Sequence, residues 1–457
     1  QEFGRDASTA GVIVTGVRRD LAPGSALEAR LHRTAVTGAA DWNLRFQGGT
    51  YQVVGHVGGS YVEGDSLAIL RTQRAPTRYF QRPDVTHVSL DSSRTVLAGY
   101  QGSLGISKLN GRHWLWNVFG YWGSPGLERN DAGRLGTTDE VNGFAEIRYR
   151  ETRPGRLFQN YSIRLISENL WNTVLDRQFG AVRTDVQLTF RNFWVANLTA
   201  WVDYRAQNQF LTRGGPSMGT PYAPVVIAQI GNSFAAKTRW NGRIYYGWNE
   251  LDGMIYRLSG GVTVRPGPRW SLSVNPNYLR YVEPQQYVTE LPGGSAATNG
   301  RRYVFARADQ STWLVPIRLN YAITPDLTLE FYGEPFAASG RFYDHGELPA
   351  PRAMRLRTYG ADGTTIVPQP DGSYTVTDGA STFTLPARDF NVRSFRSNLV
   401  LRWEWRPGST LYLVWQQDRS SETSSGELVP VFSPFDAVTA RGTSFLAIKV
   451  SYWLAAR

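Results

Sequence analysis

The sequence predicts an all-β fold, a transmembrane antiparallel β-barrel of about 18 strands, within a range of roughly 16 to 20 or more. Three observations predict it. Apolar and polar residues alternate with a period of two over segments spread along the whole chain, as in residues 443–454. Helical periodicity is nearly absent, so we expect no long helix. Short turns alternate with long connections, as they do in bacterial outer-membrane barrels.

The segment at residues 443–454 shows the alternation clearly. Ile448 and Val450 belong to its apolar set, and Lys449 and Ser451 lie between them. Because successive side chains of a strand point to opposite faces, the two sets occupy opposite faces. We expect this segment to be the last barrel strand, paired with the first strand of the chain. Ile448 and Val450 then face lipid, whereas Lys449 and Ser451 face the lumen.

Other segments separate their faces in the same way. The apolar positions that we expect to face lipid include Val186, Leu188, Trp270, Leu272, Val274, Trp313, Ile317, Leu319, Tyr321, Leu329, Phe331, Leu399, Leu401, Trp403, Leu411, Leu413 and Trp415. The charged positions that we expect to face the lumen are Glu146, Arg148, Arg164, Asp185, Arg191, Arg265, Arg318, Glu330, Glu334, Arg396, Arg402, Glu404, Arg406 and Asp418. Pairs of opposite sign among them can brace neighbouring strands, which is the structural alternative to a selective transport path. If water passes, the arginine excess predicts a mild anion preference.

Connection lengths give the expected topology. Short turns are predicted near residues 48, 110, 154, 192, 241, 266, 324 and 407, with longer connections between them. In bacterial outer-membrane barrels the short turns are periplasmic and the long loops are extracellular. Both chain ends then lie on the short-turn side. We expect residues 65–93 and 341–391 to shape the mouth of the barrel.

Composition excludes several classes of function. The chain has no cysteine, which removes disulfides, thiol catalysis and zinc–cysteine sites. Lys108, Lys237 and Lys449 are the only lysines among 49 basic residues, and the net charge is +11. Arginine suits lipid headgroups and lipopolysaccharide because it binds phosphate in a bidentate way, although a genome rich in arginine codons explains the same bias. The arginines are dispersed and form no compact basic motif, so we expect no nucleic-acid partner.

Soluble β folds are the main alternative to a membrane barrel. A large sandwich, propeller or jelly roll also alternates and also lacks helices. A propeller, however, repeats every 40 to 50 residues or so, and no such repeat is present. Charged and amide side chains also back the apolar face with regularity along long strands. Both observations favour the membrane barrel.

Several motifs carry a family resemblance. They are Arg78-Tyr79-Phe80-Gln81-Arg82-Pro83-Asp84, Ser124-Pro125-Gly126-Leu127-Glu128-Arg129-Asn130-Asp131, Arg302-Tyr303-Val304-Phe305-Ala306 and Lys449-Val450-Ser451-Tyr452-Trp453-Leu454. Over nearly its whole length the chain resembles the C-terminal region of the family called domain of unknown function 5916. Members of that family resemble outer-membrane barrels preceded by a family-nine-type carbohydrate-binding module.

The resemblance implies an architecture and lends no chemistry. No segment of this chain corresponds to the carbohydrate-binding module. We therefore expect residues 1–457 to be a single barrel domain of a longer precursor. The resemblance also implies one or more strands before the turn at Gly4-Arg5-Asp6.

We expect neither an enzyme nor a cofactor. The five histidines are scattered without the spacing of metal ligands, and no Gly-x-Ser-x-Gly motif marks a nucleophile. We therefore assign no catalytic, cofactor-binding or metal-binding residues.

The loop at residues 65–93 is the most distinctive connection, because it gathers arginines and aromatic residues. Aromatic side chains stack on sugar rings and arginines hold carboxylates or phosphates, so one interpretation is a lid or constriction that contacts solutes. The alternative is a loop that packs on the barrel mouth for structural reasons. The candidate mouth and lumen residues are Arg78, Tyr79, Phe80, Arg82, Arg318, Glu330, Arg402 and Glu404.

These patterns favour a protein of the bacterial outer membrane that forms a pore or uptake channel, with carbohydrate-like solutes as the suggested class. Outer-membrane lipid and lipopolysaccharide are its expected partners. One alternative is a closed barrel that anchors a periplasmic module or an envelope partner. A second alternative is a soluble glycan-binding β protein.

Overall fold

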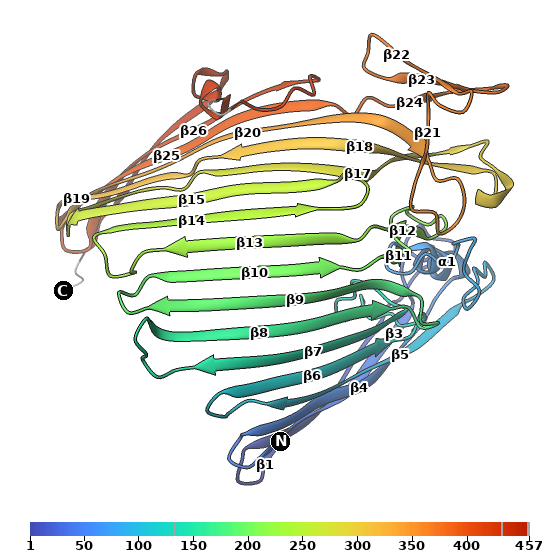
Figure 1. The fold of residues 1–457 in the computed structure, drawn as a ribbon, viewed down its shortest axis with the longest axis horizontal. Helices are drawn as coiled ribbons and strands as arrows, with labels where there is room; N and C mark the ends of the chain where they lie inside the picture. The colour runs from blue at the N-terminus through green and yellow to red at the C-terminus, as the bar shows by residue number, and fades with distance from the viewer. Residues whose placement is uncertain (132, 431–432, 455–457) are drawn as a thin grey trace.

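The computed structural model describes residues 1–131, 133–430 and 433–454. Within them the chain forms one large antiparallel sheet of 22 strands, with a two-stranded and a three-stranded sheet at its margin. Figure 1 shows the strands of the large sheet side by side, each joined to the next along the chain.

The sheet consists mostly of long strands. These are β2 (Ser8–Arg18), β3 (Thr34–Phe46), β4 (Tyr51–Glu63), β5 (Val96–Lys108), β6 (Trp114–Gly123), β7 (Glu140–Glu151), β8 (Phe158–Trp171), β9 (Arg177–Phe190), β10 (Val195–Asp203), β13 (Ala223–Gly231), β14 (Thr238–Trp248), β15 (Met254–Gly267), β17 (Asn277–Pro292), β18 (Arg301–Leu314), β20 (Leu327–Glu347), β25 (Phe390–Arg406), β26 (Ser409–Thr423) and β27 (Gly442–Ser451).

Shorter elements complete the fold. The short strands are β1 (Glu2–Phe3), β11 (Ala206–Asn208), β12 (Met218–Thr220), β16 (Trp270–Val274), β19 (Ile317–Thr324), β21 (Arg357–Thr358), β22 (Thr365–Pro368), β23 (Tyr374–Asp378) and β24 (Ser381–Leu385). The helices are α1 (Ser66–Arg74) and the 3₁₀ helices η1 (Ala296–Thr298) and η2 (Ser433–Thr439). No helix in the described part of the chain is both long and apolar enough to cross a bilayer.

Proline interrupts two strand positions of the large sheet. β16 and β17 both pair with β15, before and after Pro276, and β18 and β19 both pair with β20, before and after Pro316. Proline has no N–H to donate to the ladder, so the strand breaks there. β1 and β21 have only two residues each, and β16 and β19 continue β17 and β18. The 22 strands therefore fill eighteen full-length positions.

The strand register confirms the predicted alternation. Residues directly opposed in antiparallel strands lie on the same face of the sheet. Successive pairings join one apolar row, which is Val264, Leu272, Leu319, Phe331, Leu399, Trp415 and Leu446. The adjacent row on the other face is Thr263, Ser273, Arg318, Tyr332, Asn398 and Gln416. The sheet thus has one apolar face and one polar face.

No second layer formed by the described residues covers the large apolar side chains. On the apolar face Leu198, Ile244 and Val118 are 48%, 51% and 54% exposed. The buried apolar clusters lie where loops fold back on the strands. One cluster, for example, joins Val304 and Phe342 to Val376 and Leu385 of the three-stranded sheet β22–β24. A single-layered sheet of this kind cannot bury its apolar face by itself.

The predicted short turns are confirmed, with one exception. The turn predicted near residue 241 is wrong, because Asn241 and Gly242 lie inside β14. The turn falls at residues 232–237, where the side chain of Asn232 accepts from Trp240 N and donates to Thr238 O, both at 2.8 Å. An Asn-Gly pair is a strong hairpin signal, but here tertiary pairing overrides it. Apart from the connection that carries η2, the long connections share the opposite end of the sheet, where α1, β11, β12 and β21–β24 gather (Figure 1).

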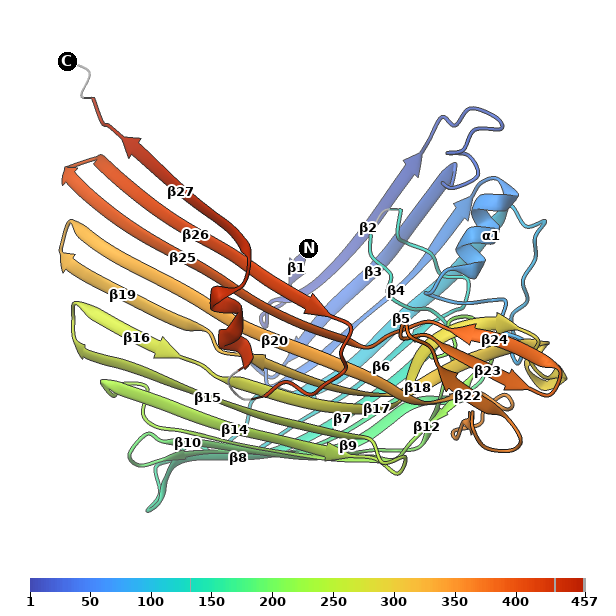
Figure 2. The same cartoon turned by 90° about the horizontal axis from the view of Figure 1, so that it is seen from above.

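The expected pairing of the last strand with the first is wrong for the described residues. There β27 pairs only with β26, while β2 pairs with β3 and β1. β1 covers only the start of the free edge of β2, at Ser8 and Thr9, and β27 does not reach the remainder. Figure 2 shows the resulting open trough, with β27 on one arm and β2 on the other. The faces of β27 are as predicted, because Lys449 opposes Tyr412 and Ile448 opposes Leu413.

Candidate functional site

The loop after β4 begins with α1, whose ends are defined by its sequence. The Asp65 side chain caps the helix by accepting from Leu67 N at 2.8 Å, and Arg71 and Arg74 lie in the last turn, where positive charge is favourable. Ile69 is fully buried and anchors the helix on the sheet. The helix therefore fixes where the rest of this loop starts.

Arg78 links the loop after β4 to the loop after β6. Its guanidinium donates to Thr72 O (2.9 Å), Leu127 O (2.7 Å) and a carboxylate oxygen of Glu128 (2.9 Å). The side chain is completely enclosed. Burial lowers the pKa of Arg78 from its ordinary value, and the charge of Glu128 opposes that shift. Arg78 thus acts as an internal brace between two loops.

Asp139 is the centre of a second brace. One carboxylate oxygen accepts from His87 Nε2 (2.9 Å) and lies 3.5 Å from Arg82 Nη2, and the other accepts from the Thr173 hydroxyl (2.5 Å). Arg82 also donates to Gln209 Oε1 at 2.5 Å. These contacts join the loop after β4 to the loops after β6, β8 and β10. Burial also lowers the pKa of Arg82, an effect that Asp139 opposes.

The aromatic residues of the same loop differ in exposure. Phe80 is 5% exposed and packs in a cluster with Val62, Ile69 and Leu97. Tyr79 is half-buried, with its ring centroid 6.2 Å from that of Phe210. Of the four residues proposed to shape the mouth, only Tyr79 offers a partly accessible side chain in this conformation.

The remaining four candidates lie near the short-turn end of the polar face, far along the strands from the mouth loop. Arg318 stacks over the Tyr332 ring at 5.3 Å, and Arg402 donates to Glu404 at 2.8 Å. Glu330 opposes Asn320 in the ladder. The eight predicted residues therefore form two separate groups, and solute contact by either group stays a prediction.

Charges on the polar face pair both across neighbouring strands and within single strands. Arg164 lies 2.7 Å from Asp185 and 3.5 Å from Glu146, and Arg183 lies 2.8 Å from the same Asp185. Arg148 donates to Glu146 at 2.8 Å. The cross-bracing expected as the structural alternative is therefore present, and it runs along β7, β8 and β9.

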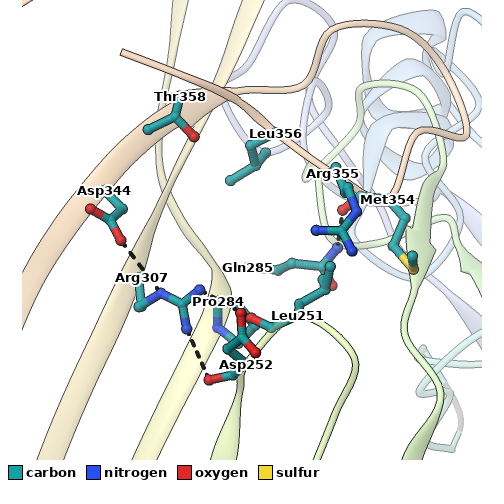
Figure 3. Close-up of a pocket in the computed structure, with 10 residues that line it drawn as sticks. All are labelled: Leu251, Asp252, Pro284, Gln285, Arg307, Asp344, Met354, Arg355, Leu356 and Thr358. Atoms are coloured by element: carbon teal, nitrogen blue, oxygen red, sulfur yellow. Dashed lines mark hydrogen bonds and ion pairs between the residues drawn. The ribbon is translucent and has the colours of Figure 1, made fainter. Parts of the chain in front are cut away.

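A pocket of about 430 Å³ at the loop end was not predicted from the sequence (Figure 3). Arg307 forms one wall, because its guanidinium donates to Leu251 O (3.0 Å) and Asp252 O (2.9 Å) and its Nε lies 3.6 Å from Asp344. The guanidinium of Arg355 is turned toward the pocket and forms no ion pair with any described residue (Figure 3).

Five separate segments build this pocket. Gln285 joins its own segment to that of Met354 by donating to Met354 O, and it also donates to Gly219 O of β12, both at 2.9 Å. No short motif could have revealed it, since its residues are scattered over about a hundred positions of the chain. The arrangement offers one accessible guanidinium beside apolar walls from Leu251 and Leu356. Among the described residues, no three His, Asp or Glu side chains gather closely enough to hold a metal ion.

The sequence model of the family described as Domain of unknown function (DUF5916) matches residues 30–455. The chain belongs to the DUF5916 family. This match confirms the resemblance carried by the motifs at residues 78–84 and 124–131. No curated protein matches this DUF5916 chain.

Several solved structures have a similar course of the chain at low sequence identity. A mutant of the ferric enterobactin receptor PfeA from Pseudomonas aeruginosa is 8% identical, with 97% of this chain and 71% of that chain covered and a TM-score of 0.43. The siderophore receptor PirA from Acinetobacter baumannii is 6% identical, with coverages of 96% and 73% and a TM-score of 0.42. The FrpB iron transporter from Neisseria meningitidis is 9% identical, with coverages of 92% and 72% and a TM-score of 0.33. None of these TM-scores reaches 0.5, so no property of these receptors is transferred to the DUF5916 chain.

Proposed function

We propose that this DUF5916 chain forms the wall of a β-barrel pore in the bacterial outer membrane, with its polar face lining the lumen. The observation that supports it most is the uninterrupted apolar row from Val264 to Leu446, which no layer of described residues covers. Water disfavours a continuous apolar face of this size, whereas a bilayer favours it. Short turns at one end and long loops at the other support the same placement.

Solutes would diffuse along the polar face, without a cofactor and without chemistry. Arg318 carries a positive charge that no described carboxylate pairs, and the whole chain has a net charge of +11. These charges favour mild selectivity for anions. Lipid and lipopolysaccharide would contact the apolar face. Carbohydrate-like solutes remain the suggested class, since the mouth offers Tyr79 and the accessible guanidinium of Arg355.

The mouth loop would limit the flow. The braces at Arg78 and Asp139 fasten residues 65–93 to the loops of three other hairpins, so the loop opens only when these buried pairs break. Full-length protein is therefore expected to conduct weakly or in rare events.

Planar-bilayer conductance tests the pore. Arg82→Ala removes a buried partner of Asp139 and is expected to raise the open fraction, with anions carrying more current than cations. Arg71→Ala is the matched control, because Arg71 is an exposed arginine of α1 that forms no ion pair with a described residue. The pore is refuted if neither variant conducts and a variant lacking residues 76–88 also stays silent.

A closed barrel that anchors an envelope partner is the second candidate. The buried braces favour it, because they fix the loop at residues 65–93 to its neighbouring loops. A stable envelope protein that co-purifies with the silent protein would support the anchor. Extraction without detergent would instead support a soluble glycan-binding protein and contradict both membrane roles.

A further inference from the structure

The pairing of β1 with β2 follows a regular antiparallel register. Glu2 opposes Thr9 and Phe3 opposes Ser8. Gln1 continues the register, because its main-chain nitrogen donates to Ala10 O (2.6 Å) and its carbonyl accepts from Ala10 N (3.0 Å). The first three residues therefore run antiparallel along one edge of β2 and cover only its turn end.

Two edges of the sheet are left without partners among the described residues. They are the rest of this edge of β2 and the outer edge of β27. Val12 and Ile448 on these strands are 79% and 68% exposed, against 48% for Leu198 in the middle of the sheet. Hydrocarbon offers no hydrogen-bond partner to an open edge, so a sheet that spans a bilayer has to close.

Strand direction limits how the gap can close. β2 runs from the turn end to the loop end, and β27 runs the opposite way. A strand that continues β1 along β2 has the same direction as β27, so it cannot be the antiparallel neighbour of β27. A second strand of opposite direction has to lie between them. Only an even number of added strands makes every pairing antiparallel.

We propose that polypeptide N-terminal to Gln1 supplies an even number of added strands, at least two. The last of them continues β1 along β2, and the first pairs with β27. The added strands are required only if the sheet spans the membrane, as proposed above, and the β1–β2 pairing identifies the upstream polypeptide as their source. A second copy of the chain is disfavoured because its β27 would have to displace β1. The upstream residues opposite Val12 and Val14 would be apolar. The upstream residues opposite Ile13 and Thr15 would face the lumen, on the same side of the sheet as Ile13 and Thr15.

Introduced cysteines test the register in the full-length protein in its membrane, and residues 1–457 contain no native cysteine that would compete. In the continued register the third residue before Gln1 opposes Ile13. This is a non-hydrogen-bonded pair, whose Cα atoms lie about 4.5 Å apart, within disulfide range. Ile13→Cys combined with a cysteine at that upstream position is expected to give an intrachain disulfide in most molecules. Val12→Cys with the same upstream cysteine is the matched control and is expected to give none, because the two side chains lie on opposite faces.

A photoreactive residue tests the other edge. p-Benzoylphenylalanine in place of Ile448 is expected to cross-link to a peptide from before Gln1 as well as to β26. The same residue in place of Leu413, which has neighbours on both sides, is expected to cross-link only to β25 and β27.

Three results would overturn the proposal. The first is a disulfide between Ile13→Cys and Ala447→Cys, which would mean that β2 closes directly on β27. The second is cross-linking to a second copy of the chain. The third is cross-linking from position 448 to β26 alone. None of these readouts depends on conductance, so the added strands and the pore can fail separately.

Discussion

Arg78 and Arg82 keep their positive charges inside the protein, where water cannot solvate them. Each is compensated by one carboxylate, Glu128 or Asp139, and by neutral oxygen acceptors. A buried pair of this kind adds little to stability relative to an apolar pair, but losing one partner leaves the other charge uncompensated. The function of the braces is therefore to define where the mouth loop lies.

Glu128→Gln is expected to lower the free energy of opening the mouth loop by about 3 kcal/mol, because it leaves the Arg78 charge buried and unpaired. Hydrogen exchange of the amides in residues 65–93 measures this opening. Glu28→Gln is the matched control, since its partner Arg33 is half exposed and such a pair contributes only about 0.5 kcal/mol. Equal protection of the loop in both variants would contradict the brace.

The sequence predicts the face on which a single residue lies where a local rule applies. Alternation is a local rule, and it correctly predicts that Arg318, Arg402 and Lys449 lie on the polar face. Burial of Arg78 obeys no local rule. It depends on Leu127 and Glu128, some fifty positions away, and composition around residue 78 fits an exposed binding loop equally well.

The three-stranded sheet β22–β24 is an element held by charge at its base. Asp378 at the end of β23 accepts from Arg357 (2.9 and 3.0 Å) and Arg302 (2.7 Å), while Glu347 accepts from the same two arginines. Hydrogen bonds from Arg357 and then Arg302 lower the pKa of Asp378 to about 2, from an ordinary value of 3.8. Folding thus stabilises the ionised form of this carboxylate.

The β22–β24 sheet is expected to loosen in acid. Because the folded pKa of Asp378 lies below its ordinary value, the stabilisation is complete above about pH 4 and is lost as the pH falls toward 2. Pepsin, which is active in this window, should cut residues 360–386 increasingly as the pH falls.

Asp378→Asn is the control for this pH dependence. It removes the titrating group, so cutting of the same segment should depend much less on pH between 4 and 2. A segment that resists pepsin equally at both pH values in the unaltered protein would contradict the role of Asp378.

Turns illustrate what local sequence signals decide at the scale of elements. Pro-Asp at residues 325–326 and Pro-Gly at residues 407–408 mark turns, because proline and glycine fit the required backbone angles. Asn241-Gly242 carries an equally strong signal but lies within β14, where Gly242 opposes Gly260. Pairing with β13 and β15 outweighs the turn preference there, and a single sequence window does not contain those partners.

At the scale of the whole molecule, strand number and direction follow from connection lengths, but closure does not. Alternation predicts that the last strand has a lipid face and a lumen face, and the register of β27 agrees. It does not predict which strand lies beside β27, because the same face pattern fits any barrel strand. The pocket at Arg307 and Arg355 is missed for a related reason, since distant loops meet there only after the sheet has formed.

A membrane barrel requires that the apolar face of the sheet meets lipid and that the polar face meets water. Leu198 and Asn197 test it, because they are neighbours on β10 that point to opposite faces. Each is replaced by cysteine in the naturally cysteine-free chain and labelled with a small fluorophore in vesicles that contain brominated lipid. We predict that bromine quenches the label at position 198 and not at 197, while a water-soluble quencher does the reverse. Equal quenching at both positions, or quenching by the aqueous agent alone, would contradict the membrane barrel.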